Sequence, residues 1–455
     1  MPKAALHNLG CKVNAYEAEA MQQQLEEHGY EIVPFDQKAD VYIINTCSVT
    51  NVADKKSRQM LHRAKKMNPE SVVVAAGCYV QVEADALKED ACVDVIIGNN
   101  KKSQLAEVLD EYLKNRGENG DIHVLDIART DEYEPLRLSR ITGHTRAFIK
   151  VQDGCNQFCS YCIIPYARGR VRSRKPEDVA EEVRGLVAQG YKEVVLTGIH
   201  LSSYGIENRE EGPVRGGNWD HRLLLDLILT INEIPGLERI RLGSLEPRII
   251  TEEFAGALAA LPKFCPHFHL SLQSGCDDTL RRMNRHYTAK DYLERCDILR
   301  RCFGRPAITT DVIVGFPGET DAEFAATREF LEQVHFFEMH VFKYSKRAGT
   351  KAAVMPGQVP EPVKAQRSDV LLDLEAAMSA EYRQGFVGQE ISVLFEEAVE
   401  IDGVTYMAGH TPQYVKAAAA VEDREKGNGL AGRICSLRAV GLLGNDMLLA
   451  EFPQR

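Results

Sequence analysis

The stretch that decides the fold runs from Ala147 to Cys162 and reads AFIKVQDGCNQFCSYC. Its apolar first part, Ala147 to Gln152, predicts a β-strand, and three cysteines with the spacing C-x3-C-x2-C follow almost at once. Three thiolates on one tight loop can ligate three irons of a [4Fe–4S] cluster and leave the fourth iron open. Cys155, Cys159 and Cys162 are therefore predicted metal ligands at the end of a strand.

A zinc site is the alternative interpretation of these cysteines. Structural zinc sites normally use four protein ligands, and no fourth cysteine or histidine is spaced to match. A zinc site would need a fourth ligand from elsewhere in the chain. The strand, the spacing and the aromatic Tyr161 together favour the iron–sulfur cluster.

Outward from this loop, strand-like runs alternate with helical patterns over residues 146–384. We expect strands at 147–152, 194–197, 239–242, 268–272, 308–314 and 338–342, and a closing helix at 361–384. Six strand–helix units predict a partial (β/α)6 barrel, whose sites are built at the carboxyl ends of the strands.

The flanking regions have different patterns. Residues 1–115 alternate strands (4–9, 41–44, 72–76, 93–97) with helices, which predicts a doubly wound parallel α/β domain. Residues 116–145 are polar and lack the regular spacing of apolar residues that is typical of a helix or strand, which predicts a linker. Residues 385–455 carry short strands separated by turns, which predicts a small all-β barrel.

Three further cysteines each close a predicted strand of the N-terminal domain: Cys11, Cys47 and Cys78. Parallel strands present their carboxyl ends along one sheet edge, so we expect these thiols to converge. Three unrelated buried cysteines are the plainer alternative. Convergence would create a second cluster with three protein ligands and an open iron.

The net charge of −11 argues against a general nucleic-acid binder, but local charge differs from the average. Residues 55–66, 154–176 and 339–360 contain several Lys and Arg and no acid, which favours an anionic substrate. Each run alone could be a solvated face. No apolar stretch approaches the length of a membrane span and the N-terminus lacks a signal pattern, so we expect a cytoplasmic protein.

C-x3-C-x2-C after the first strand of a partial barrel resembles the radical SAM signature. In that superfamily, S-adenosylmethionine (SAM) chelates the open iron and is cleaved on reduction to a 5′-deoxyadenosyl radical. Further stretches resemble its SAM-contacting strand ends, namely LTG at 196–198, SLQSG at 271–275 and DVIVGFPGET at 311–320. The resemblance implies a cofactor site formed by Tyr161, Gly198, Ser271, Gln273, Ser274, Asp311, Gly315 and Glu319.

A preceding three-cysteine domain and a C-terminal TRAM-type barrel resemble the methylthiotransferases over essentially the whole chain. The stretches LGCKVN (9–14), TCSVTNVAD (46–54), GCYVQ (77–81), QDGCN (152–156) and LTGIH (196–200) look most like the MtaB-type branch. That branch converts N6-threonylcarbamoyladenosine beside the tRNA anticodon, at position 37, to its 2-methylthio derivative. The resemblance implies two [4Fe–4S] clusters, two SAM molecules per product, all six cysteines as catalytic ligands, and a reductase-type electron donor. The sequence does not identify the sulfur source.

The tRNA anticodon loop is the implied partner, since unpaired bases are what sequence-specific RNA enzymes usually engage. We expect phosphate contacts from the run after the cluster loop and from the end of the last barrel strand: Arg168, Arg170, Arg172, Arg174, Lys343 and Tyr344. The C-terminal region has six Lys or Arg against ten Asp or Glu, which does not predict an RNA clamp.

Other functions stay open from the sequence. Within the same enzyme class, the target could be isopentenyladenosine in tRNA or an aspartate of a ribosomal protein. A non-enzymatic alternative is an RNA-binding protein whose clusters sense redox state. This last alternative predicts no cleavage of SAM.

Overall fold

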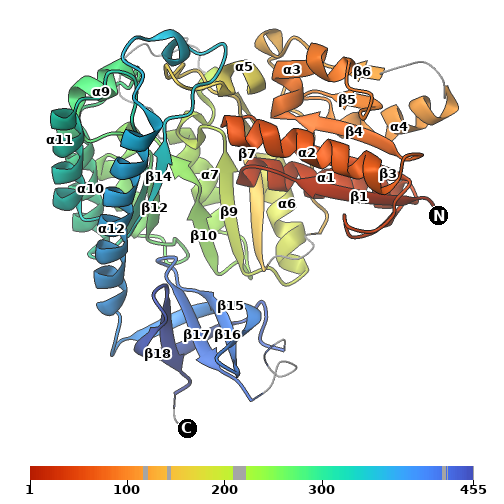
Figure 1. Ribbon diagram of the computed structural model, residues 1–455. Coiled ribbons are helices and arrows are strands. Elements are labelled where there is room, and N and C mark those ends of the chain that lie inside the picture. The colour runs from red at the N-terminus through yellow and green to blue at the C-terminus, as the bar shows by residue number, and fades with distance from the viewer. Residues whose placement is uncertain (116–120, 141–144, 209–221, 423–426, 428, 454–455) are drawn as a thin grey trace.

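The computed structural model describes residues 1–115, 121–140, 145–208, 222–422, 427 and 429–453. The N-terminal domain lies beside the central barrel, and the C-terminal barrel lies beneath the central one (Figure 1). In these described residues no helix has both the length and the apolar character needed to cross a membrane.

The N-terminal domain is built on a parallel sheet with the strand order β2-β1-β3-β4-β5-β6. Helices α1 and α4 pack on one face, and α2 and α3 pack on the other. This doubly wound arrangement confirms the predicted fold class. Its elements are β1 (Lys3–Asn8), α1 (Lys12–Glu27), β2 (Glu31–Ile32), β3 (Val41–Thr46), α2 (Asn51–Met67), β4 (Val72–Gly77), α3 (Cys78–Lys88), β5 (Val95–Ile97), η1 (Lys102–Gln104), α4 (Leu105–Lys114) and β6 (Asp121–His123).

The predicted linker is only partly irregular. Residues 121–123 form β6, which pairs in parallel with β5 and extends the N-terminal sheet. Leu136 and Leu138 are buried in the core of the central domain. The linker prediction is therefore wrong for these stretches, because their burial depends on partners distant in sequence. Residues 116–120 and 141–144 lie outside the described part of the chain.

The central domain is an open barrel whose strands β7, β9, β10, β12, β13 and β14 alternate with helices, as predicted. Strand β11 continues β10 and pairs with β12, joining the two sheet halves. The elements are η2 (Ile127–Arg129), β7 (Arg146–Asp153), α5 (Ile164–Arg168), β8 (Arg172–Ser173), α6 (Pro176–Ala188), β9 (Glu193–Gly198), η3 (Leu201–Ser203), η4 (Ile206–Asn208), α7 (Arg222–Asn232), β10 (Arg239–Leu242), β11 (Ser244–Leu245), η5 (Pro247–Ile249), α8 (Glu252–Ala259), β12 (His267–Leu270), α9 (Asp277–Arg282), α10 (Ala289–Phe303), β13 (Ala307–Val314), α11 (Asp321–Val334), β14 (Glu338–Lys343), η6 (Lys351–Val354) and α12 (Glu361–Gln384).

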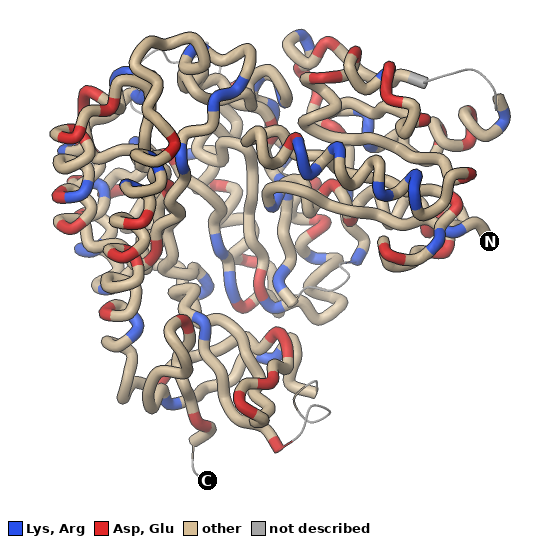
Figure 2. Tube along the Cα trace, in the orientation of Figure 1, with Lys and Arg blue, Asp and Glu red and all other residues tan. Residues whose placement is uncertain are grey.

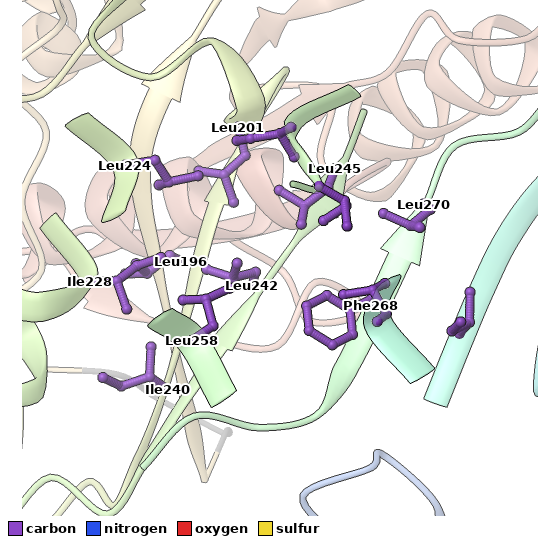
Figure 3. Packing of buried hydrophobic residues seen from close by; sticks show 14 of the residues in the cluster. Leu196, Leu201, Leu224, Ile228, Ile240, Leu242, Leu245, Leu258, Phe268 and Leu270 are labelled. Carbon is purple, nitrogen blue, oxygen red and sulfur yellow. The ribbon is translucent and has the colours of Figure 1, made fainter. Parts of the chain in front are cut away.

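A continuous apolar core fixes the barrel strands against their helices. Figure 3 shows Leu196 of β9, Leu242 of β10 and Phe268 of β12 among side chains from α7 and α8, including Ile228 and Leu258. These side chains are nearly inaccessible to solvent. Burial of this kind stabilises by about 25 cal/mol for each Å² of apolar surface. The strand ends are therefore held rigidly, which favours a precise site above them.

The C-terminal region closes into a barrel with the strand order β15-β16-β17-β19-β18, which confirms the predicted all-β unit. Its core contains Val393, Phe395 and Met407. Helix α12 runs along β14 and leads into the C-terminal barrel (Figure 1). The strands are β15 (Glu390–Ile401), β16 (Val404–His410), β17 (Lys416–Ala420), β18 (Ile434–Leu443) and β19 (Met447–Glu451).

Candidate active site

The cysteine loop after β7 begins with a turn that only glycine can make. Gly154 has a φ of +73°, and a Cβ there would lie 1.8 Å from the carbonyl oxygen of Arg170. A side chain is thus excluded both by strain and by overlap. The amide of Cys155 donates to the carbonyl of Gly169 at 3.0 Å, which ties the loop to the turn that follows it.

The three thiols of this loop lie close enough to influence one another. Burial raises the pKa of Cys155 to about 12, with Cys159 adding to the effect. Burial, Cys159 and Cys155 together raise the pKa of Cys162. Nη1 of Arg285 donates to Sγ of Cys159 at 3.4 Å. Metal ligation requires thiolates, and a cation beside the set offsets their negative charge, so these residues fit an iron–sulfur cluster.

Four predicted SAM-contacting residues are partly exposed, one in this loop and three on or directly after barrel strands. The ring of Tyr161 is partly buried, edge-on to Phe316 with 6.3 Å between ring centroids. Ser271 is partly exposed at the end of β12, and Asp311 is partly exposed in β13. Gly198 ends β9 beside Gln152. These positions remain proposed cofactor contacts.

The other predicted SAM-contacting residues form hydrogen bonds within the protein. Nη1 of Arg367 donates to the Glu319 carboxylate at 2.6 Å, and the Gly315 amide donates to it at 2.6 Å. Ser274 is fully buried with its hydroxyl 3.2 Å from that of Thr327. The side chains of Ser274 and Glu319 thus have structural partners, and their contacts with the cofactor stay a prediction. They and Gly315 shape the turns after β12 and β13.

Gln273 also has a structural role. It is buried with a φ of +73°, its amide donates to the carbonyl of Asp311, and its own carbonyl accepts from the amide of Ile313. These bonds join the end of β12 to β13. The predicted contact of Gln273 with the cofactor stays a prediction.

The other cysteine triplet converges as its strand-end positions predict. Cys11, Cys47 and Cys78 follow β1, β3 and β4, which are neighbours in the sheet. A Cβ on Gly10 would lie 3.0 Å from Sγ of Cys47. Burial raises the pKa of Cys47 to about 11, and Cys78 and Cys11 add to it. The three thiols therefore share one space.

Arg168 reaches from the barrel domain to this second triplet. Its side chain is fully buried, and its Nε donates to Sγ of Cys78 at 3.2 Å. Its Nη1 lies 2.7 Å from a carboxylate oxygen of Glu17. Arg168 ends α5, shortly after Cys162, so its guanidinium ties Cys78 and Glu17 of the N-terminal domain to the barrel domain.

A buried charge network surrounds Arg168. Lys150 forms ion pairs of 2.7 Å with both Glu17 and Asp153, and Lys102 also pairs with Glu17. Uncompensated buried charge is costly, and the cations here outnumber the carboxylates that pair with them in the described residues. Ionised cysteines and an anionic cluster at Cys78 would balance that excess, so the residues fit such a group.

The predicted phosphate contacts need correction. Arg168, Arg172 and Arg174 are buried, and Arg174 pairs with Glu182. Tyr344 is also buried, against Phe316. The prediction that these four residues bind tRNA is wrong, because the arginine run folds between two domains instead of facing solvent. Arg170 and Lys343 are exposed and remain proposed contacts.

Sequence reasoning missed several polar residues around the two triplets. Arg285 contacts Cys159, and Lys12 follows Cys11 directly. His200 lies near Arg285; burial lowers its pKa to about 3, and Arg285 and Arg248 add to the effect, so its ring is neutral. His269 and His340 lie on β12 and β14. No spacing in the sequence distinguishes these residues from ordinary polar ones, because their neighbours come from distant elements.

Comparison with known families gives two matches. Residues 149–331 match the radical SAM superfamily, and residues 3–98 match the uncharacterized protein family UPF0004. A solved radical S-adenosylmethionine methyltransferase, TsrM from Kitasatospora setae, shares the fold with a TM-score of 0.57 and 16% identity. That alignment covers 78% of this chain and 75% of the other.

Curated relatives match nearly the full length. The chain is 41% identical over 418 residues to the threonylcarbamoyladenosine tRNA methylthiotransferase MtaB of Bacillus subtilis, covering 91% of this chain and 90% of the relative. It is 37% identical to the MtaB of Thermotoga maritima, with both chains covered completely. It is also 36% identical to a tRNA-2-methylthio-N(6)-dimethylallyladenosine synthase of Thermoanaerobacter, covering 86% of this chain and 81% of that one.

Proposed function

Because this chain belongs to the radical SAM tRNA methylthiotransferase family, we propose that it converts N6-threonylcarbamoyladenosine at position 37 of tRNA to its 2-methylthio derivative. Carbon 2 of adenine has no acidic hydrogen and no good leaving group, so sulfur insertion there needs a radical. The two three-cysteine sites, one on each domain, carry the proposal, and Arg168 of the barrel domain contacts Cys78 of the N-terminal site. Its tRNA substrate would place the reaction in the cytoplasm.

Cys155, Cys159 and Cys162 would hold the family's [4Fe–4S] cluster. When bound with SAM, that cluster supplies the reductive cleavage that yields a 5′-deoxyadenosyl radical. Arg285 offsets thiolate charge at Cys159 and its Nη2 donates to the carbonyl of Ser271 at 3.1 Å. Arg285 thus positions the end of β12 beside the cysteine loop.

Cys11, Cys47 and Cys78 would hold a second [4Fe–4S] cluster, whose open iron would hold the sulfur for transfer. Arg168 donates to Sγ of Cys78 and would hold the N-terminal domain against the barrel domain at this point. Asn99 supports the same position, since its Nδ2 donates to the carbonyl of Ala167 at 2.7 Å and lies 3.6 Å from Sγ of Cys78. A reductase-type electron donor and a sulfur source complete the reaction.

We place the tRNA on the outer face of α2 and on the loop after β14. Figure 2 shows the Lys and Arg positions along α2, and five of them are exposed: Lys55, Lys56, Arg58, Arg63 and Lys66. Nδ2 of Asn51 donates to the carbonyl of Lys346 at 2.9 Å, so the start of α2 adjoins that loop. Exposed cations on both elements suit an RNA backbone. The C-terminal barrel, which we assign as TRAM-type, would contribute to tRNA binding by its shape.

Nucleoside mass spectrometry of tRNA from a deletion strain tests the proposed function. We expect 2-methylthio-N6-threonylcarbamoyladenosine to disappear and to return when the wild-type chain is expressed. Persistence of that nucleoside would contradict the proposal. Loss of the methylthio isopentenyl nucleoside, or of a methylthiolated ribosomal aspartate, would identify the alternative substrates. Release of 5′-deoxyadenosine by the reduced protein would exclude a purely sensory role.

A further inference from the structure

His62, Asp90 and Cys92 form a polar cluster on the N-terminal domain, away from its cysteine triplet. His62 lies on α2, and the other two residues lie in the turn between α3 and β5. Because this turn leads into β5, the cluster lies at the amino ends of the parallel strands, whereas the cysteine triplet follows their carboxyl ends. The six residues of β4 span about 20 Å between these two edges of the sheet. The cluster therefore does not belong to the proposed iron–sulfur site.

The three side chains meet at one carboxylate. A ligand atom from each of them lies within 4.8 Å of the other two. Nε2 of His62 is 2.7 Å from one carboxylate oxygen of Asp90, and the amide of Cys92 donates to the other oxygen at 3.0 Å. The amide of Val93 donates to the carbonyl of Asp90 at 2.9 Å. Backbone bonds thus fix the turn that brings the carboxylate and the thiol together beside α2.

An imidazole, a carboxylate and a thiol are the ligands of a zinc-class ion. Zinc binds these groups at about 2.0–2.3 Å, so the ligand atoms of a tetrahedral site lie about 3.3–3.8 Å apart. Magnesium and calcium prefer oxygen ligands alone. The side chain of His62 is 54% exposed and has room to turn towards such a site. Small side-chain rotations would therefore bring the three atoms to zinc-binding distance.

The charges around the cluster are compatible with a bound cation. Lys65 is close enough to act on Cys92, but its ammonium pairs with Asp94 at 2.7 Å and donates to the carbonyl of Ser71 at 2.8 Å. Its positive charge is therefore already compensated. Burial raises the pKa of Cys92 and the carboxylate of Asp90 adds to this effect, so the thiol keeps its proton at neutral pH. A metal ion that binds the sulfur would displace this proton to solvent.

We propose that His62, Asp90 and Cys92 bind a divalent zinc-class ion, with a water molecule as the fourth ligand. The ion would tie α2 to the turn before β5 and would stabilise the N-terminal domain, since it binds the folded chain. This site goes beyond the proposed function, because neither SAM nor tRNA takes part in it. The alternative is a surface histidine–carboxylate pair with an unrelated cysteine beside it, which predicts no effect of zinc.

Thiol alkylation of the iron–sulfur-loaded enzyme, with mass spectrometry of its peptides, tests the site. Under anaerobic conditions, one equivalent of zinc should slow the alkylation of Cys92 by iodoacetamide at least about 10-fold, because a metal-bound sulfur is a poor nucleophile. The same amount of magnesium should have no effect. Cys435, a partly exposed thiol of the C-terminal barrel, reports any general effect of zinc. Iron content before and after treatment confirms that the clusters stay intact.

Variants of the other two ligands show whether the protection needs the whole cluster. His62→Ala changes an exposed side chain, and Asp90→Asn keeps the shape of the carboxylate, so both should fold and both should lose the protection by zinc. His28→Ala removes another exposed histidine of the same domain, at the end of α1, and should retain it. Zinc should also raise the melting temperature of the wild type and of His28→Ala, but not that of His62→Ala.

Two results would overturn the proposal. The first is an alkylation rate of Cys92 in the wild type that zinc leaves unchanged, or that magnesium lowers as much as zinc does. The second is equal protection of Cys92 in the wild type and in His62→Ala, which would show that the thiol binds zinc without the histidine.

Discussion

At the scale of single residues, Arg168 shows how one side chain can join two domains at a candidate metal site. Its guanidinium joins Cys78 to Glu17 and Asp153 inside the protein. A lysine could keep the charge but not the several directed bonds, because its ammonium is a point charge on a flexible stem.

We therefore expect Arg168→Lys to retain cleavage of SAM and lose at least about 10-fold in methylthiolation, the scale of one lost charged hydrogen bond. Reaction of the reconstituted enzyme with tRNA, quantifying 5′-deoxyadenosine and methylthio nucleoside together, measures both. Arg184→Lys, on the exposed face of α6, is the control. Equal loss of both products would assign Arg168 a general structural role.

Glu17 gives a prediction for stability and pH. Burial would raise its pKa, but Arg168, Lys102 and Lys150 outweigh that effect and hold the pKa well below 4.5. Glu17→Gln leaves these cations unpaired and should cost about 3–5 kcal/mol. A carboxylate whose pKa is lower in the folded than in the unfolded protein stabilises the fold above the unfolded pKa of 4.5. This stabilisation is lost as the pH falls through the lower pKa of the folded protein.

Thermal unfolding of the two proteins from pH 7 down to pH 3 checks this prediction. The melting temperature of Glu17→Gln should lie about 5–15 °C below wild type at pH 7. The difference in melting temperature between the two proteins should narrow below pH 4.5. A gap that stays constant over the whole range would show that Glu17 acts through packing instead of charge.

At the scale of elements, strand ends were easier to predict than loops. The β7 strand and its cysteine loop follow from local apolar pattern and spacing, and the three N-terminal cysteines follow from their places after β1, β3 and β4. The burial of Arg172 and Arg174 could not be predicted, since an alternating arginine run looks solvated until Glu182 and Asp153 pack against it.

Helix α2 is the element that we assign to tRNA. Lys55→Glu with Lys56→Glu should weaken tRNA binding about 10-fold or more and lower the slope of log affinity against log salt by roughly the number of lost phosphate contacts. Binding titrations at several salt concentrations measure both quantities. Arg184→Glu with Lys290→Glu makes the same charge change on α6 and α10 and should have a smaller effect. Equal weakening by both pairs would refute a localised surface.

At the scale of the whole molecule, the C-terminal barrel is anchored to the base of the central one. Arg241 donates to the carbonyl of Pro412 at 2.8 Å, and Arg239 donates to that of His410 at 3.0 Å. The guanidinium carbons of Arg146 and Arg241 each lie 4.9 Å from the centroid of the Tyr414 ring. Sequence patterns predicted this barrel but not its docking, which depends on pairs far apart in the chain.

Loss of this anchor should loosen the C-terminal barrel. Tyr414→Ala removes both cation–π contacts, each worth about 0.5–2 kcal/mol, and should speed proteolysis between α12 and β15 several-fold. Limited proteolysis followed by mass spectrometry locates the cut. Tyr406→Ala, on strand β16 of the same barrel, controls for barrel stability. Unchanged cleavage in Tyr414→Ala would show that the arginine–carbonyl bonds suffice.

The two cysteine triplets carry the central claim, that the barrel site generates the radical and the N-terminal site delivers sulfur. The most direct test is one reaction of the reconstituted Cys11→Ala, Cys47→Ala, Cys78→Ala variant with SAM, reductant and tRNA, in which both products are quantified. We expect about four irons per chain, 5′-deoxyadenosine near the wild-type level, and no methylthio nucleoside. Loss of 5′-deoxyadenosine from the folded variant, or formation of the methylthio nucleoside, would contradict this division of labour.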